Sequence, residues 1–561
     1  MNAKFVIALA VVVASQVTPS LAEDSQPDFD QLVDRAIFQE NALLKILRGE
    51  RPIAETYIQD MEPDTDFGAV PRTDHYFLGK LDLSRGVNTG SLLPQSSTKT
   101  RAFEVFTRLF STKYLPRGFA QMILIDGGQF DRAHYDFEFV KREFLGDVRT
   151  VVINVAPKKN AGSGRFIGRM WVEDRDFNVV RFNGTYSKPR DGEFYMHFDS
   201  WRVNCGPALW VPFESYSEES ALPYALGMRK LRVKGVTRIW GYTTATDRSA
   251  GEFTNLTVDL PSVKDSSDQA ADNSPVESVR AWEQQAQDNI VGRLEKANLM
   301  APAGDVEKVL DTVVNNLMVT NNLDIVPEAH VRVLLTMPLE TFGVGHTIVI
   351  SRGLLDTLPD EASLAAILCH ELAHIVLGQE TDTKFAFSDR VNFSDEETLR
   401  KFRFARTQAD EDAANAKALE FLQKSPYSDK LNQAGLFLKA LAAESEQLPN
   451  LIKPLFGSRM AAGNNVLRLS ALLQRAPELQ RTRVDQIAAL PLGTRTSLDP
   501  WTDRLRLTKL RQVPLLSDRE KLPFEITPIY LRLRYESAPD AQVLEGSLPK
   551  PQESPAAVSR P

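Results

Sequence analysis

Two histidines four residues apart are the first feature of this chain that indicates chemistry. His370 and His374 flank Glu371 and two apolar residues in the run His-Glu-Leu-Ala-His. On a helix, residues four apart share a face, so both imidazoles point the same way. Two neutral imidazoles at this spacing can hold Zn²⁺, and the adjacent carboxylate can take a proton from water activated by the metal. The pattern therefore predicts metal-assisted hydrolysis.

The alternative interpretation is a pair of hydrogen-bonded core histidines on a buried helix. It would leave Glu371 buried beside them, which is costly unless a cation accompanies the carboxylate. The chain has only 7 histidines, so a chance match to the motif is rare. We therefore favour a metal site with one zinc ion per chain, held by His370 and His374, with Glu371 as general base.

The helix that must position these residues is well delimited. Residues 364–377 are mostly apolar, Pro359 and Asp360 supply a start signal, and Gly378 supplies a stop signal. Such an apolar helix is expected in the core of its domain.

A third ligand is expected, because catalytic zinc usually has three protein ligands. The acidic start of a helix predicted at residues 409–422 is the best source, and Glu411, 37 residues after His374, is one candidate for the ligand. Asp410 and Asp412 compete for this role on sequence alone. The alternative is an acidic first turn that the helix dipole favours.

Residues 305–504 resemble the zinc metallopeptidases related to HtpX heat-shock proteases and CAAX prenyl proteases. The features that carry the resemblance occur in order: a strand at 331–336, the run 347–355, the lead-in Pro359-Asp360-Glu361, the His-Glu-Leu-Ala-His helix, the third-ligand helix, and Pro426-Tyr427-Ser428-Asp429. The family's third ligand is the Glu of a Glu-x-x-Ala-Asp-x-x-Ala pattern, which Glu411, Ala414 and Ala418 match. The resemblance thus implies a mainly α-helical zincin-type domain, Glu411 as third ligand and polypeptides as substrates.

Several positions depart from the family pattern. Asn415 stands where the family has an Asp that accepts a hydrogen bond from a ligating His, and Gln379 replaces a common His. Glu340-Thr341 replaces an Asn-Ala pair, Asp499-Pro500 replaces a His-Pro pair, and Arg504 stands where a family Arg is expected. Loss of such supporting contacts typically costs about 10–100-fold in metal affinity or activity. The alternative function is therefore a catalytically impaired metallopeptidase fold that serves as a periplasmic lipid- or polypeptide-binding or chaperone module.

The resemblance also makes residues 347–351 an edge strand beside the cleft, to which an extended peptide can add by main-chain pairing. His346 precedes this strand, and Tyr427 and Arg504 are further weak candidates for substrate contact. A lone His at the start of a strand is more often a surface residue.

The region before this domain is rich in strand signals. Residues 29–61 look helical, and from 76 to 242 strand-like runs alternate with turns. They are predicted at 148–155, 165–172, 178–186, 193–203, 209–216 and 230–242, which indicates an antiparallel sheet or open half-barrel. Residues 137–240 weakly resemble lipoprotein-sorting proteins such as LolA, in which the sheet holds acyl chains; a packed sheet without ligand is the alternative.

The fold class that we predict is α+β, with an antiparallel β-rich half-barrel-like domain before the metallopeptidase domain. The expected divisions are a signal peptide at 1–22, the β-rich domain at 23–260, a linker at 261–285, the metallopeptidase domain at 286–535 and a disordered tail at 536–561.

The N-terminus has the layout of a secretory signal. Lys4 precedes an apolar run at 5–14, and Ser20-Leu21-Ala22 suits cleavage after Ala22. The run is too short to span a bilayer, so no transmembrane anchor is expected in the mature chain. We predict export, with the sorting-protein resemblance favouring the periplasm and possible lipid or lipoprotein contact.

Composition limits the other function classes. The net charge of −8 argues against a general nucleic-acid binder, which needs a concentrated basic face. Two cysteines, Cys205 and Cys369, are too few for a disulfide scaffold, and Cys369 within the apolar helix is expected to be a core residue.

Overall fold

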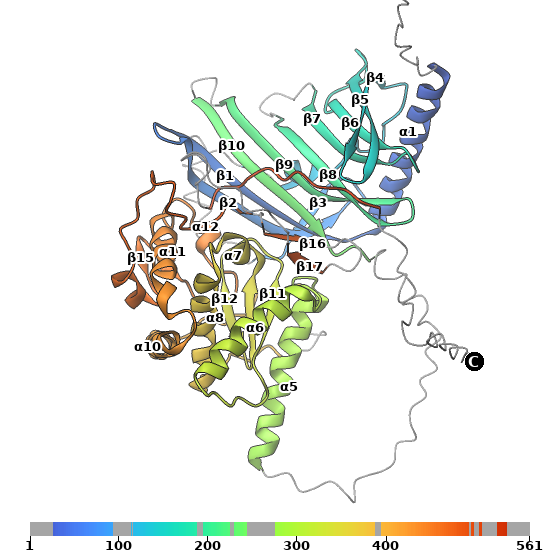
Figure 1. Ribbon diagram of the computed structural model, residues 1–561. Coiled ribbons are helices and arrows are strands. Elements are labelled where there is room, and N and C mark those ends of the chain that lie inside the picture. The colour runs from blue at the N-terminus through green and yellow to red at the C-terminus, as the bar shows by residue number, and fades with distance from the viewer. Residues whose placement is uncertain are drawn as a thin grey trace, which may run out of the picture.

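The computed structural model places a large antiparallel sheet beside a helical region that contains a small sheet (Figure 1). The predicted α+β class is confirmed. The structure describes residues 26–93, 114, 116–187, 195–224, 229–243, 275–387, 394–492, 495–498, 504–507 and 524–535. The predicted signal peptide, the tail at 536–561 and the Asp499-Pro500 pair lie outside the described residues.

Ten strands form the large sheet, in the order β3-β2-β1-β10-β9-β8-β7-β6-β5-β4. Their bounds are β1 Ile53–Asp64, β2 Gly68–Asp82, β3 Asn88–Ser91, β4 Tyr135–Leu145, β5 Val148–Pro157, β6 Phe166–Glu173, β7 Val179–Tyr186, β8 His197–Gly206, β9 Leu209–Tyr224 and β10 Arg229–Trp240. Strands β5, β6, β7 and β10 match the predicted runs to within two residues, whereas β8 begins four residues later than predicted and β9 extends eight residues further. Every pair in this sheet except β1–β10 joins consecutive strands, as in a meander of hairpins, whereas the consecutive strands β3 and β4 lie at opposite edges.

The helix predicted at 29–61 is wrong in its second half. Helix α1, Gln26–Gly49, ends before Pro52, and β1 begins at Ile53. Proline removes a backbone donor, and Thr56, Tyr57 and Ile58 are residue types that favour strands. Strand β1 then pairs with both β2 and β10, so tertiary pairing decides its conformation.

The two faces of the large sheet are covered by different segments. Helix α1 packs on one face, where its Val33 shares a buried cluster with Val151 and Ile153 of β5. On the other face Val152 clusters with Leu533 of the C-terminal segment 524–535, which we name the strap. Neighbouring residues of β5 therefore face opposite sides, as strand geometry requires. Figure 1 shows the strap in dark red across the sheet.

The later part of the strap packs on the large sheet, although its sequence falls in the range predicted as metallopeptidase domain, whereas its first residues, Phe524 and Ile526, belong to the core cluster that includes the helical region. The Tyr530 ring lies 5.2 Å from the Trp201 ring in an edge-on arrangement, and the Tyr535 hydroxyl donates to Glu173 over 2.9 Å. Residues late in the sequence therefore pack on the sheet that the first half of the chain forms.

The helical region is built mainly on α6 and α8. Its helices and short 3-10 turns are α5 Pro275–Lys296, α6 Asp305–Thr320, α7 Arg352–Thr357, α8 Glu361–Val376, α9 Asp395–Leu399, α10 Gln408–Lys424, η3 Ser428–Lys430, α11 Leu431–Ala443, α12 Pro449–Ile452 and η4 Ser470–Gln474. Its strands are β11 His330–Leu334, β12 Thr341–Val344, β13 Thr347–Ser351, β14 Ala461–Ala462, β15 Asn465–Val466, β16 Thr496–Leu498 and β17 Leu505–Leu507. Helix α5 begins within the range predicted as linker, and after that range Ala286, Ile290 and Leu294 give it a fully buried stripe.

Buried polar contacts join the two regions. The Glu55 carboxylate of β1 accepts the backbone N–H of Met337 over 2.6 Å, and the Asp74 carboxylate of β2 accepts those of Asn450 and Leu451. Apolar residues of both regions also belong to one core cluster. Among the described helices, none has the length and apolar character needed to cross a bilayer.

Candidate metal centre

Helix α8 carries the two histidines and is bounded as predicted. The Asp360 side chain caps it by accepting the N–H of Ser363, and Gly378 follows its end in a left-handed conformation, φ +63°. Most of this helix is buried, and His370, Glu371 and His374 are each no more than 1% exposed. Polar side chains in such a place require partners.

Helix α10 supplies the third residue. Thr407 caps it, and Ala414 and Ala418 are fully buried where α10 packs on α8. Their small side chains allow the two helices to approach closely, and the Cys369 thiol of α8 donates to the Ala418 carbonyl over 3.5 Å. Glu411, one turn before Ala414, therefore faces the histidines.

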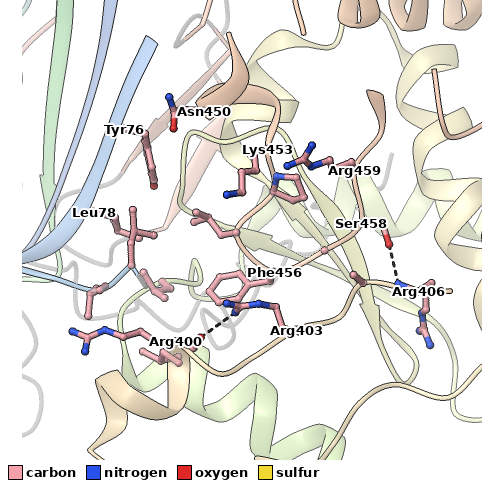
Figure 2. Close-up of a pocket in the computed structure, with 18 of the residues that line it drawn as sticks. Tyr76, Leu78, Arg400, Arg403, Arg406, Asn450, Lys453, Phe456, Ser458 and Arg459 are labelled. Atoms are coloured by element: carbon pink, nitrogen blue, oxygen red, sulfur yellow. Dashed lines mark hydrogen bonds between the residues drawn. The ribbon is translucent and has the colours of Figure 1, made fainter. Parts of the chain in front are cut away.

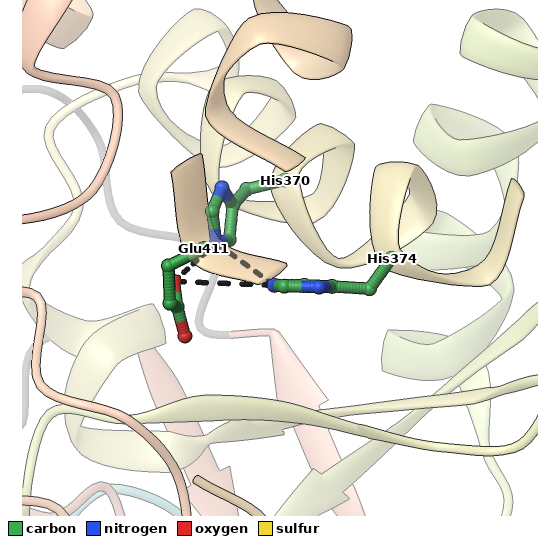
Figure 3. A group of neighbouring side chains, drawn as sticks. All are labelled: His370, His374 and Glu411. Atoms are coloured by element: carbon green, nitrogen blue, oxygen red, sulfur yellow. Dashed lines mark hydrogen bonds and ion pairs between the residues drawn. The ribbon is translucent and has the colours of Figure 1, made fainter. Parts of the chain in front are cut away.

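Three side chains converge at this helix contact (Figure 3). His370 Nε2 lies 3.0 Å from Glu411 Oε2 and 3.2 Å from His374 Nε2, and His374 Nε2 lies 3.9 Å from Glu411 Oε2. Asp410 and Asp412 stay outside this group, bonded to Thr407 and Gln408 within their own helix turn. Of the three acidic candidates, the structure brings only Glu411 to the histidines.

The donor set suits zinc. Ligands about 2.0–2.1 Å from a tetrahedral zinc ion lie about 3.3 Å from each other, close to the separations found here. Two imidazole nitrogens and one carboxylate oxygen are also a common set for catalytic zinc. The residues present therefore fit this metal.

His370 is held in the neutral state that a metal needs. Burial, followed by the charge of Arg468, lowers the pKa of His370 to about 4. His374 Nδ1 lies 2.5 Å from Gln379 Oε1, and the Gln379 amide nitrogen donates to the Asp410 carbonyl over 3.3 Å, which fixes the orientation of that amide. His374 therefore donates from Nδ1 and keeps the Nε2 lone pair for a metal. Gln379 performs this orienting role.

Arg468 is the buried cation that the sequence analysis missed. Its Nη1 donates to Glu371 Oε1 over 2.8 Å, and its Nε and Nη2 donate to the two Glu411 oxygens over 3.1 and 3.2 Å. Burial raises the pKa of Glu411, but the His370 hydrogen bond and the Arg468 charge outweigh it and hold the pKa well below its usual range. One guanidinium thus compensates two buried carboxylates.

Asn415 does not have the role that the family pattern implies. Its Oδ1 accepts the Leu469 N–H over 2.7 Å and its Nδ2 donates to the Leu467 carbonyl over 3.4 Å. Asn415 thus holds the segment that carries Arg468 and makes no hydrogen bond to either histidine. His370 Nδ1 is buried without a hydrogen-bond partner among the described residues.

The remaining candidates lie outside the cluster. Arg504 packs beside Gly304 ahead of α6. The Tyr427 hydroxyl donates to Glu361 over 2.9 Å and so supports the start of α8. His346 precedes β13 and is not part of the metal-binding group, and Cys205 and Cys369 are buried and form no disulfide within the described residues.

The predicted edge strand is wrong. Strand β13, Thr347–Ser351, lies between β11 and β12, so β12 is the edge strand on that side. The Thr341 and Gly343 carbonyls of β12 already accept bonds from Arg468 and Thr381, each over 3.4 Å. A Cβ at Gly343 would lie 3.7 Å from Glu371 Oε2, so this strand passes beside the carboxylate.

Comparison with known proteins supports a peptidase relationship for the part of the chain that carries the histidines. No curated protein matches the chain. One protein-family model matches residues 310–393, a range that includes His370, Glu371 and His374 but neither Glu411 nor Arg468. Residues 310–393 match the family model of peptidase family M48, whose members are metal-dependent peptidases.

Proposed function

We propose that this protein is a zinc-dependent endopeptidase that hydrolyses peptide bonds. The observation that carries the proposal is the buried group of His370, His374 and Glu411, with Glu371 held beside it by Arg468. A core histidine pair would need no such arrangement of two carboxylates around a shared cation. The match to peptidase family M48 supports the same reaction class.

The side chains divide the chemistry between them. His370, His374 and Glu411 would hold one zinc ion, which when bound polarises the scissile carbonyl and makes water a better nucleophile. Arg468 donates a hydrogen bond to Glu371 Oε1, whereas Glu371 Oε2 makes no hydrogen bond within the described residues. Glu371 Oε2 is therefore the atom that takes the proton from water and passes it to the leaving amine.

We further propose that the enzyme acts outside the cytoplasm, in the periplasm, on misfolded envelope proteins. The N-terminal signal-like sequence supports export. Main-chain pairing with the edge strand β12 suits substrates of varied sequence, although two of its carbonyls are already engaged.

The test is metal content and casein cleavage by the mature chain, residues 23–561. The proposal predicts one zinc per chain, loss of cleavage on chelation and recovery when zinc is returned. His374→Ala should lose both zinc and cleavage, whereas His197→Ala, a matched change at a 72% exposed histidine, should lose neither. Stoichiometric zinc without chelator-sensitive cleavage would favour the non-enzymatic binding protein.

A further inference from the structure

A cavity of about 710 Å³ opens beside Glu411, where the large sheet meets the helical region. The sheet contributes Tyr76 and Leu78 of β2, and the helical region contributes two segments, 399–408 and 450–459 (Figure 2). We name this cavity the basic cleft, because five cations line it: Arg400, Arg403, Arg406, Lys453 and Arg459.

The cations of the basic cleft are bonded mainly to backbone carbonyls, although the charges of Glu371, Asp410 and Glu411 also act on Arg406. Arg400 donates to the Ser91 carbonyl, Arg403 to the Arg400 and Phe402 carbonyls, and Arg406 to the Gln379 and Glu380 carbonyls, all of which are uncharged. None of the five forms an ion pair with a carboxylate of the described chain. The single carboxylate in the lining is Glu411, which already serves His370 and Arg468. This concentration of positive charge contrasts with the chain's net charge of −8.

Arg406 connects the basic cleft to the metal centre. It binds the backbone carbonyl of Gln379, whose side chain orients His374. A Cβ at Gly343 would lie 3.7 Å from both Arg406 Nη2 and Glu371 Oε2, so the cation and the carboxylate flank the same point of β12. A chain held in the cleft would therefore reach the general base.

The rest of the cleft lining is largely apolar. Tyr76 and Leu78 from the sheet lie with Leu455 and Phe456 from the helical region. A ligand that fits must offer negative charge to the cations and apolar groups to these residues. A polypeptide with Glu or Asp beside apolar residues has both.

We infer that the basic cleft selects acidic segments of polypeptide for cleavage, an inference that rests on the proposed peptidase function. Like-signed charges that line a cleft focus the field and raise the local concentration of an oppositely charged ligand, which increases association rates by about 10–10³-fold. The selection should therefore appear in KM and kcat/KM, and it should weaken as salt shortens the Debye length from about 10 Å at 0.1 M to about 3 Å at 1 M.

The experiment compares two quenched-fluorescence peptides with one apolar core, flanked by Glu in one and by Gln in the other. The zinc-loaded enzyme should cleave the Glu peptide with a kcat/KM at least about tenfold higher at low salt, and the ratio should approach one at high salt. The triple variant Arg403→Glu, Lys453→Glu and Arg459→Glu should prefer the Gln peptide. The matched control Lys45→Glu, Lys430→Glu and Arg475→Glu changes charge equally at exposed positions outside the cleft and should keep the native preference.

Equal cleavage of both peptides by the native enzyme, or an unchanged preference in the cleft variant, would overturn the inference. If neither peptide is cleaved, the proposed function fails. Fluorescence anisotropy of the labelled peptides then still tests whether the basic cleft binds acidic segments. Binding of the Glu peptide that the cleft variant loses and the control keeps supports selection of acidic segments. Binding of heparin but not of the Glu peptide contradicts it.

Discussion

Arg468 offers the sharpest test of how the site is held together. We consider Arg468→Met, which keeps much of the apolar stem but removes the guanidinium. In the native protein this group donates three hydrogen bonds of 2.8, 3.1 and 3.2 Å to Glu371 and Glu411, and its side chain is 3% exposed. The variant leaves two buried carboxylates without their cation.

Removing one partner of a buried ion pair typically costs about 3–5 kcal/mol. We therefore expect the free energy of unfolding of metal-free Arg468→Met to fall by about that amount, measured by urea denaturation in the presence of chelator. Zinc supplies positive charge beside Glu411, so the deficit should shrink when the metal is present. Catalysis should fall by about 10–100-fold, because Glu371 loses the contact that orients it.

The control is Arg483→Met, which removes a 54% exposed arginine that pairs with Asp485. Surface pairs contribute about 0–1 kcal/mol, so this variant should unfold almost like the native protein. If Arg468→Met unfolded within about 1 kcal/mol of the native protein and stayed fully active, the reasoning about the shared cation would be refuted.

Three further predictions follow from other contacts. Gln379→Ala should weaken zinc binding by about 10–100-fold in a chelator competition assay, because His374 loses its Nδ1 acceptor; equal affinity would contradict this role. Burial raises the pKa of Glu340 to about 7, so between the unfolded value near 4.5 and pH 7 the folded state binds the additional proton. The free energy of unfolding of the native protein relative to Glu340→Gln should therefore fall by about 3 kcal/mol from pH 4.5 to pH 8, and a flat difference would contradict the shift. Truncation after residue 523 should lower the melting temperature, because the strap buries Phe524, Ile526 and Leu533; an unchanged value would show that the strap adds no stability.

Local patterns were enough to predict much of the site. The apolar run of α8 with its start and stop signals, and the four-residue spacing of His370 and His374, are properties of one helix. Local sequence left Glu411, Asp410 and Asp412 as alternatives, and only the family resemblance favoured Glu411. The structure brings Glu411 to the histidines because the buried Ala414 and Ala418 turn its face towards α8. The zinc ligands and the general base themselves stay predictions until metal and activity are measured.

Contacts between distant segments were not predictable. Arg468 is one of 66 basic residues, and no local spacing distinguishes the one that folding brings to Glu371. The central place of β13 depends on parallel pairing with β11, from which it is separated in sequence by β12, and the strap packs on strands that lie hundreds of residues earlier in the sequence. Asn415 likewise holds the backbone of residues 467–469, a contact between distant segments that the family pattern did not predict.

Cleavage by Glu371→Gln tests the central claim most directly, with Glu420→Gln, an exposed carboxylate on α10, as the matched control. Gln is nearly the same size as Glu but does not act as a base, so zinc should stay bound at one per chain while casein cleavage disappears. The control should bind zinc and cleave like the native enzyme. Full cleavage by zinc-loaded Glu371→Gln would contradict the account.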